Sequence, residues 1–379
     1  MERSVILDFF ENRLDRITGS IREIVELESP SRDVERNRAV SSWVENEARK
    51  IGIDLEIERK AADDFGDHLI IRAFQSEAKG VLLLGHTDTV HPAGTLELNN
   101  IRNEDGRLYG PGVFDMKSNV VLMLEALRYF AETGTTPARP ITILLSCDEE
   151  VGSFTGREHV EREAALSEFC LVCEPSSNGR VKTGRKGTGM FTVKAHGVPA
   201  HAGLEPEKGA SAIVELAGQI EQLQSLNNAS IGTTVNVCTI KGGTATNVIP
   251  EHAECTVDVR FSTMAEATRI DAAIRGLAST NERVSLEILG GVNRPPLERT
   301  DAVVALYERA RAIATSFYYE LGETQVGGAS DGNFVGALGV PLLDGVGIAG
   351  DGAHTLNEYI YIDDIPKRAA LMTMMLAVV

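Results

Sequence analysis

The sequence lacks two motifs that identify many hydrolytic and nucleotide-binding sites. Neither HExxH nor GxxxxGK[ST] occurs in the 379 residues, which excludes a zinc site built on one helix and a phosphate-binding P-loop. The glycine-rich stretch GRKGTG (184–189) lacks the strand, loop and helix order that a phosphate site requires. If the chain is catalytic, its reactive residues must be scattered along the sequence.

Cysteine is also scarce. The chain has five cysteines, at positions 147, 170, 173, 238 and 255, and an odd, sparse set is typical of reduced thiols in a reducing compartment. Cys170 and Cys173 have the CxxC spacing of a redox motif, but they lie in the apolar run FCLVC. Two small buried side chains in a strand are the better interpretation of this pair.

Long hydrophobic runs and an excess of positive charge are absent as well. No stretch of 18 uncharged apolar residues occurs, and the first residues, MERSVILDFFENRLDRI, lack the basic and apolar regions of a signal peptide. We therefore expect a cytoplasmic protein without a membrane partner. With 37 basic and 55 acidic residues, the formal net charge of −18 argues against nucleic acid as a partner. The acidic excess serves solubility, and some of the carboxylates could also hold cations.

The first half of the chain alternates helical and strand patterns. The spacing of apolar residues predicts helices at 6–28, 31–51, 116–133 and 155–166, and strands at 53–58, 68–74, 81–84, 141–147 and 169–173. Ser31 is a candidate N-cap of the second helix. Strands as apolar as VLLL (81–84) belong in the interior of a sheet. The alternation therefore predicts an α/β domain with a mostly parallel sheet flanked by helices.

The pattern changes near Gly184. From there the chain reads strand, helix, strand, strand, helix and strand, at 189–196, 207–225, 233–240, 252–261, 265–280 and 283–289. This β-α-β-β-α-β order is that of a ferredoxin-like α+β unit. The pair Pro295–Pro296 marks its exit, and a helix is expected at 301–316. We predict a larger domain of residues 1–184 and 292–379, with an inserted α+β domain of residues 185–291.

Five short stretches supply residues that could bind metal or transfer protons. They are, in order, GHTDTVHP with His86 and Asp88, GPGVFDMKSN with Asp115, SCDEEVGS with Asp148, Glu149 and Glu150, CEPS with Glu174, and GDGAHTLNEY with His354. At least three of them follow predicted strands of the larger domain. Because ligands of α/β sheets gather at the carboxyl ends of the strands, several of these side chains are expected to converge.

Each stretch also has an interpretation without metal. His86 could lie in an incidental loop and His354 in a surface turn, Asp115 could be a helix N-cap, and Glu174 could simply end a strand. Three adjacent carboxylates could form a solvated turn, but at one strand end they repel one another unless a cation is near. Histidine and carboxylate ligands without cysteine suit zinc, with manganese or cobalt as substitutes. A carboxylate that bridges two ions would explain why so many acids converge.

Taken in this order, GHTDTVHP, GPGVFDMKSN, DEEVGS, CEPS and the late AH turn resemble the metallopeptidase family of glutamate carboxypeptidase, acetylornithine deacetylase and succinyl-diaminopimelate desuccinylase. The resemblance extends over nearly the whole chain and includes GVPAHAG, GGTATNVIP and DVRFS in the inserted domain. It implies a zinc-exopeptidase-like catalytic domain, an inserted dimerisation or lid domain, and a homodimer.

The resemblance also implies a role for each candidate residue. It implies two divalent metal ions per chain, with Zn²⁺ expected and Co²⁺ or Mn²⁺ as substitutes. His86 and Glu174 resemble ligands of one ion, Glu150 and His354 ligands of the other, and Asp115 the bridging carboxylate. Asp88 matches the residue that orients the ring of His86, and Glu149 matches the general base. The substrate-binding residues of the inserted domain are matched by His201, Asn247 and Arg260, and His201 could reach into the partner's site.

The expected reaction is hydrolysis of an amide bond in a small peptide or an N-acyl amino acid. The forked guanidinium of Arg260 suits a substrate carboxylate, which favours an amide whose amine side is an amino acid with a free carboxylate. The stretches VKTGRKGTG and GVPAHAG look most like the glutamate-releasing carboxypeptidases, whereas GGASDGNF suggests a deacylase of the acetylornithine or succinyl-diaminopimelate type. A metal-binding scaffold without activity is disfavoured because Glu149 and all five ligand positions are present.

Overall fold

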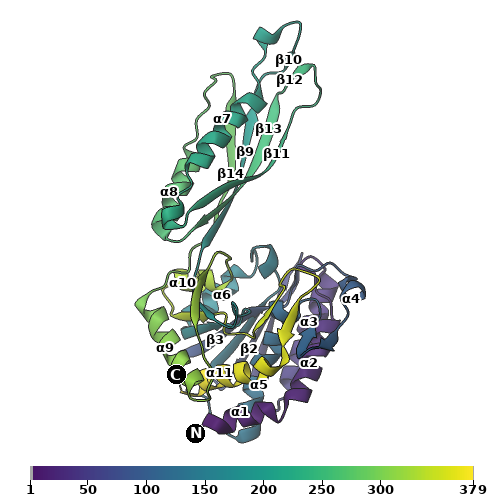
Figure 1. The fold of residues 1–379 in the computed structure, drawn as a ribbon, viewed down its shortest axis with the longest axis vertical. Coiled ribbons are helices and arrows are strands. Elements are labelled where there is room, and N and C mark those ends of the chain that lie inside the picture. Colours follow the sequence, from purple (N-terminus) through teal and green to yellow (C-terminus); the bar gives the residue numbers. More distant parts are fainter. Residues whose placement is uncertain (1–2, 379) are drawn as a thin grey trace. The chain divides into compact units, whose positions relative to one another are not determined.

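The computed structural model describes residues 3–378, and the chain forms two compact units (Figure 1). The larger unit comprises Met1–Gly184, Arg299–Gln325 and Ser330–Val379, and the smaller comprises Arg185–Glu298 and Val326–Ala329. The sequence predicts a return to the larger domain at residue 292. The chain instead returns at Arg299, because the last strand of the smaller unit continues to Arg294.

An eight-stranded sheet forms the centre of the larger unit. Its strands, in spatial order, are β1 (Leu55–Ala62), β2 (Gly66–Ala73), β6 (Ile141–Ser146), β3 (Gly80–His86), β7 (Ser167–Val172), β16 (Leu342–Asp344), β8 (Val181–Arg185) and β15 (Glu323–Val326). β6, β3, β7 and β16 run parallel to one another. β1 pairs antiparallel with β2, β2 with β6, and β16 with β8. The predicted parallel sheet is thus confirmed at the centre, with antiparallel strands outside it.

Helices cover both faces of this sheet. On one face, α1 (Arg3–Glu11), α2 (Leu14–Glu26), α5 (Ser118–Thr133) and α11 (Ile365–Val378) share a core with alternate strand residues such as Leu83 and Leu171. α6 (Arg157–Ala165) and α10 (Gly332–Ala337) pack on the other face (Figure 1). The remaining helices of this unit are α3 (Val34–Arg49), α4 (Thr95–Leu98) and α9 (Asp301–Thr315). β3 is buried along Val81–Leu84, as its apolar sequence predicts.

Two details of the first helices differ from the prediction. The expected helix at 6–28 is split into α1 and α2, because Arg13 has a non-helical backbone with φ −117° and ψ 9°. The N-cap of α3 is Asp33, whose carboxylate accepts a hydrogen bond from the amide of Arg36. Ser31, the expected cap, donates its hydroxyl to Asp88 instead, with 2.7 Å between the oxygens.

A second, smaller sheet of the larger unit joins distant parts of the chain. Its spatial order is β17 (Gly350–Asp351), β18 (Tyr359–Tyr361), β5 (Arg107–Tyr109) and β4 (Arg102–Glu104). β18 pairs antiparallel with β5, with Tyr359 opposite Tyr109. The pairing brings the segment after β5, which contains Asp115, close to the turn before β18, which contains His354.

The smaller unit is a four-stranded antiparallel sheet with two helices. The strand order is β11 (Thr234–Gly242), β13 (His252–Phe261), β9 (Gly187–His196) and β14 (Ser285–Arg294), and the helices are α7 (Ala212–Ser225) and α8 (Met264–Arg275). This is the expected ferredoxin-like arrangement. Phe191, Val193 and Ala195 of β9 pack into the core, and the residues between them, such as Lys194, lie on the opposite, polar face. A short pair, β10 (Ala200–His201) and β12 (Val248–Ile249), extends this unit.

Among the helices that the structure describes, none is both long and apolar enough to cross a membrane. All five cysteines are free, and only Cys238 is exposed. Burial raises the pKa of Cys170 and of Cys173 well above the ordinary value. Both thiols are therefore buried, as expected, with Cys170 in β7 and Cys173 directly after its end.

Candidate metal centre

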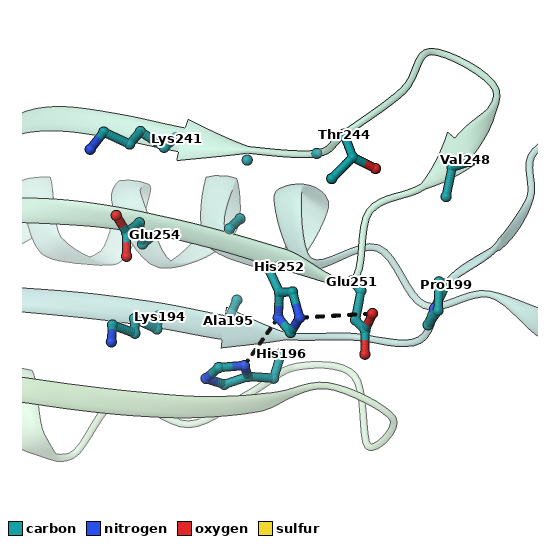
Figure 2. A pocket seen from close by; sticks show the side chains of 13 residues that line it. Lys194, Ala195, His196, Pro199, Lys241, Thr244, Val248, Glu251, His252 and Glu254 are labelled. Carbon is teal, nitrogen blue, oxygen red and sulfur yellow. Dashed lines mark hydrogen bonds and ion pairs between the residues drawn. The ribbon is translucent and has the colours of Figure 1, made fainter.

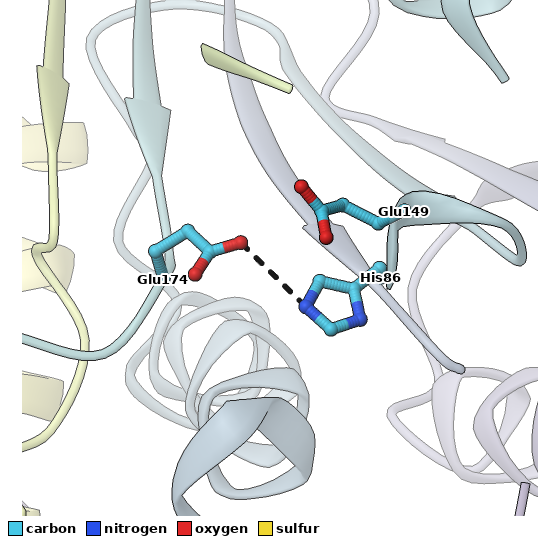
Figure 3. Close-up of side chains that lie close together, drawn as sticks. All are labelled: His86, Glu149 and Glu174. Carbon is cyan, nitrogen blue, oxygen red and sulfur yellow. Dashed lines mark ion pairs between the residues drawn. The ribbon is translucent and has the colours of Figure 1, made fainter. Parts of the chain in front are cut away.

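The first group of site residues lies at the carboxyl ends of three neighbouring parallel strands. β3 ends at His86, β6 is followed by Glu149 and Glu150, and β7 is followed by Glu174. The register of β3 and β7 pairs Leu84 with Val172, and the same offset places His86 level with Glu174. Ligand atoms of His86, Glu149 and Glu174 all lie within 4.8 Å of one another (Figure 3).

Asp115 lies between two histidine and glutamate pairs. His86 Nε2 is 3.3 Å from Asp115 Oδ1 and 3.5 Å from Glu174 Oε1. His354 Nε2 is 3.3 Å from Asp115 Oδ2 and 3.3 Å from Glu150 Oε2. Each carboxylate oxygen of Asp115 therefore faces a different imidazole, and each imidazole also faces a glutamate.

The charges of these groups are tightly linked. Burial alone would lower the pKa of His86, but its contacts with Asp115 and Asp88 and the charge of Glu174 outweigh burial and raise the pKa well above the usual value. Contacts with Asp115 and Glu150 raise the pKa of His354 to about 10. Burial would raise the pKa of Asp115, but His354 and His86 hold it below its ordinary value. The carboxylates thus favour the protonated form of both imidazoles.

A pair of divalent ions fits this arrangement. Nitrogen-to-oxygen separations of 3.3 to 3.5 Å are those of ligand atoms that share a zinc ion at about 2.0–2.2 Å each. Among the described residues, Glu150 Oε1 is buried and accepts no hydrogen bond, and burial together with the charge of Asp115 raises the pKa of Glu150 although His354 opposes the shift. A cation would supply the missing partner of this oxygen.

The segment that carries Asp115 is held by one buried carboxylate. Oε1 of Glu358 accepts hydrogen bonds from the amides of Phe114 and Asp115, both at 2.8 Å, and Oε2 accepts one from the amide of Gly112, also at 2.8 Å. His91 Nε2 lies 2.6 Å from the same Oε2. Asp115 is not a helix N-cap, because α5 begins only at Ser118; the peptide bond between Asp115 and Met116 is cis.

Asp88 links His86 to the turn of Glu149 and Glu150. Its Oδ1 is 3.4 Å from His86 Nδ1, which also lies 2.9 Å from the backbone oxygen of Asp88. Both oxygens of Asp88 accept hydrogen bonds from backbone amides, from Glu149 and from Glu150, each at 3.2 Å. The buried carboxylate of Asp88 accepts a hydrogen bond from Ser31. It therefore fixes the orientation of the His86 ring and the position of the backbone of both glutamates.

The stretch GASDG (328–332) matches the GxSxG motif of serine hydrolases, but its surroundings exclude that role. Ser330 is fully buried, and its hydroxyl donates to Asp344 at 2.7 Å. The neighbouring Asp331 accepts hydrogen bonds from the hydroxyls of Ser146 and Ser153, which lie on either side of the Glu149 turn. The stretch therefore supports the turn that carries Glu149 and Glu150.

His354 projects from an exposed turn with an unusual backbone. Its φ is 65°, in the left-handed region that is uncommon for residues other than glycine. About half of its side chain is exposed, whereas His86 is fully buried. The two imidazoles thus reach Asp115 from different environments, His86 from the sheet and His354 from the surface turn.

The smaller unit carries the other three predicted residues. The pairing of β10 with β12 brings the stretches of His201 and Asn247 together, and the amide of Ala202 donates to the backbone oxygen of Asn247 at 2.9 Å. Arg260 on β13 is half-buried, and its guanidinium contacts both oxygens of Asp258, at 2.8 Å at the closest. Arg260 therefore has an acidic partner on its own strand.

Comparison with known sequences identifies relatives that match most of the chain. The model of peptidase family M20/M25/M40 matches residues 82–377. Carboxypeptidase G2 of Pseudomonas sp. (strain RS-16) is 28% identical over 365 residues, which cover 93% of this chain and 86% of that protein. Succinyl-diaminopimelate desuccinylase of Dechloromonas aromatica (strain RCB) is 31% identical over 317 residues, covering 76% of this chain and 80% of the relative.

Solved structures share the fold. Aminopeptidase PepT of Bacillus cereus ATCC 10987 superposes with a TM-score of 0.77 at 22% identity, covering 96% of this chain and 98% of the other. The M20 family metallo-carboxypeptidase Sso-CP2 of Sulfolobus solfataricus gives a TM-score of 0.73 at 16% identity, with coverage of 96% and 98%.

Replacing Glu358 with Gln should weaken metal binding while the protein stays folded. The side chain of Gln has only one accepting oxygen, so it cannot keep all three hydrogen bonds that the two oxygens of Glu358 accept from the segment 112–115, and Asp115 is held less firmly. Loss of such support for a ligand typically costs about 10- to 100-fold in metal affinity. Zinc titration of the metal-depleted protein by calorimetry measures the change.

Glu28→Gln is the matched control. Glu28 also accepts two backbone hydrogen bonds, from the amides of Gly94 and Leu96, but that loop carries none of the candidate metal ligands. Its zinc affinity should stay within about twofold of the original. Equal losses in both variants would contradict the role assigned to Glu358.

Proposed function

We propose that this chain, which belongs to peptidase family M20/M25/M40, is a hydrolase that splits an amide bond with two divalent metal ions, Zn²⁺ being the expected ion. In this proposal His86 and Glu174 hold one ion, Glu150 and His354 hold the other, and Asp115 bridges them. The observation that supports it most strongly is the placement of the two Asp115 oxygens, each 3.3 Å from a different imidazole.

Glu149 is the proposed general base. Two bound ions would acidify a water molecule and polarise the carbonyl of the amide. Glu149 lies beside His86 and Glu174 and is nearly buried (Figure 3), so its carboxylate can take the proton of that water and deliver it to the departing amine. Its neighbour Glu150 faces His354 instead, which divides proton transfer and metal binding between adjacent residues.

His201 is the proposed donor to the oxygen of the amide carbonyl. Its Nδ1 accepts hydrogen bonds from the amides of Gly203 and Leu204, at 3.2 and 3.1 Å. In a neutral imidazole an accepting Nδ1 leaves the proton on Nε2. The exposed His201 is therefore prepared to donate from Nε2 to the negative charge that develops on the oxygen, in its own or in the partner's site.

The proposed substrate is an amide whose amine side is an amino acid with a free carboxylate. Arg260 would bind that carboxylate with its forked guanidinium, and Asn247 would contribute a polar contact beside His201. Similarity to a carboxypeptidase over 93% of this chain favours carboxypeptidase activity, and the stretches VKTGRKGTG and GVPAHAG favour the glutamate-releasing type. Similarity to desuccinylases makes an N-acyl amino acid deacylase the second candidate.

Replacing Glu149 with Gln should lower kcat by a factor of about 100 or more, since general-base catalysis contributes about 10²–10⁴-fold. Glu149 is not one of the five proposed ligands, so the variant should bind as many ions as the original protein. Activity on N-acyl-glutamates and metal content by mass spectrometry are measured on the same sample. An unchanged kcat would eliminate Glu149 as the base, and undetectable hydrolysis by the original protein would favour a metal-binding scaffold.

Substrate class is tested with a panel of folate-like and other N-acyl-glutamates, short dipeptides, N-acetylornithine and N-succinyl-diaminopimelate. We expect the N-acyl-glutamates to be hydrolysed fastest. Replacing Arg260 with Met should raise the KM for these substrates about 10- to 100-fold, because a hydrogen bond to a charged group contributes about 1.5–3 kcal/mol. Arg275→Met, which removes another arginine of this unit with an acidic partner, is the control. If N-acetylornithine or N-succinyl-diaminopimelate were preferred, the deacylase assignment would replace the carboxypeptidase one.

We propose that the protein resides in a reducing compartment such as the cytoplasm, where free thiols persist. We also propose that it forms a homodimer through the smaller unit. β11 is an edge strand of the four-stranded sheet, and its residues from Thr239 to Gly242 are exposed. Ile240 on this edge and Ile213 and Val214 on α7 are exposed apolar residues. An open strand edge beside exposed apolar side chains is a suitable surface for a second copy of the chain.

Light scattering should give about twice the chain mass, and Ile240→Lys should shift the protein toward the monomer. The exposed Ile240 side chain is not needed for the core, so the variant should stay folded. Leu289→Lys, an exposed apolar position on the opposite edge strand, should remain dimeric. A monomeric original protein would contradict the dimer and leave His201 to act only in its own chain.

A further inference from the structure

A cavity of about 400 Å³ lies within the smaller unit, apart from all the proposed zinc ligands (Figure 2). It is found where β9 ends at His196, β11 ends at Gly242 and β13 begins at His252. Its walls include two lysines, two histidines and two glutamates, namely Lys194, Lys241, His196, His252, Glu251 and Glu254. The proposed hydrolysis assigns no role to this cavity.

The two histidines face each other across neighbouring strands. His252 of β13 is paired with His196 of β9 in the antiparallel register, so both side chains emerge on the same face. Their Nδ1 atoms are 3.3 Å apart (Figure 2). The rings meet nearly edge to face, with 5.4 Å between their centres.

The other nitrogen of each ring faces a carboxylate. His196 Nε2 is 3.5 Å from Glu287 Oε2, and His252 Nε2 is 3.7 Å from Glu251 Oε2. In metal sites, a ligating imidazole commonly directs its second nitrogen to a carboxylate, which fixes the tautomer and makes the first nitrogen a better ligand. In both imidazoles of this pair the second nitrogen likewise faces a carboxylate, within the distance of an ion pair.

In one pair of tautomers, two nitrogen lone pairs lie close together. If each Nε2 carries a proton toward its carboxylate, both Nδ1 atoms are acceptors and neither can donate to the other. A cation between them satisfies both. Two nitrogens that bind one zinc ion at about 2.0–2.1 Å with tetrahedral angles are about 3.3–3.4 Å apart, which agrees with the observed 3.3 Å.

We propose that His196 and His252 form a third metal site, distinct from the dinuclear centre, for a divalent ion of the kind that prefers imidazole, with Zn²⁺ as the reference ion. The two Nδ1 atoms are the protein ligands, and water in the adjoining cavity completes the coordination. The lysines of the cavity are balanced by Glu251 and Glu254 in its wall and by Glu287, whose Oε2 is also 3.9 Å from Lys194 Nζ. The site therefore does not present a net positive charge to the ion.

Equilibrium dialysis against Zn²⁺ tests the site on the full chain, with bound zinc counted by mass spectrometry. The original protein should bind one ion per chain more than His196→Asn and one more than His252→Asn. Both histidines are partly exposed, so each variant should fold, which thermal unfolding without zinc verifies. Zinc binding at this site should be at least about tenfold weaker in either variant, because one of two protein ligands is lost.

Lys241→Gln is the matched control, since it changes the wall of the same cavity without removing a nitrogen ligand. It should keep the additional ion. Equal zinc binding by the original protein and both histidine variants would overturn the proposal and leave the two rings joined only by a shared proton. A loss in Lys241→Gln as large as in the histidine variants would overturn it as well. Amide hydrolysis should persist in all three variants, so the outcome is independent of the proposed function.

Discussion

The repulsion among carboxylates at the ends of three parallel strands is the constraint on which the larger unit depends. Asp115, Glu150 and Glu174 approach two imidazoles at 3.3 to 3.5 Å. Two like charges 4 Å apart cost about 4 kcal/mol at the effective dielectric constant of a protein site, so such a group persists only with compensating positive charge. The carboxylates raise the pKa values of His86 and His354, because a proton on either imidazole contributes compensating positive charge. Divalent ions bound at the same positions would supply more positive charge than these protons do.

A set of buried carboxylates with other tasks keeps this arrangement in place. Glu358 fixes the segment of Asp115 through three backbone amides, Asp88 fixes the ring of His86 and the backbone of two glutamates, and Asp331 holds two serines around the same turn. These groups are satisfied by hydrogen bonds, whereas Glu150 Oε1 accepts none among the described residues. The contrast separates the supporting carboxylates from those suited to a cation.

The sequence predicts the alternating fold and the five candidate ligands because each depends on local pattern, namely apolar strands followed by polar residues and short motifs in a fixed order. The sequence does not predict the supporting roles of Ser31, Glu358 and Asp331, although Ser31 precedes a predicted helix and the other two lie in the stretches GDGAHTLNEY and GGASDGNF. A supporting residue is defined by its partner, and the partner of Ser31 is 57 positions away in the sequence. The pairing of β18 with β5, which brings the turn of His354 to Asp115, joins segments about 250 residues apart and has no local signal. The return boundary at residue 292 was wrong for a similar reason, since the length of β14 depends on its pairing with β9.

The smaller unit also places carboxylates beside arginine and histidine side chains, but on one face of its sheet. Its helical face forms a core, while its polar face carries Arg260 with Asp258 and the histidine pair with its carboxylates. In the proposed centre, Asp115 is the ligand that both ions would share. Counting the zinc bound per chain in the original protein, in Asp115→Ala and in His354→Asn tests this directly. We predict that Asp115→Ala loses both ions of the centre and His354→Asn loses one; an Asp115→Ala variant that keeps both ions would contradict the account.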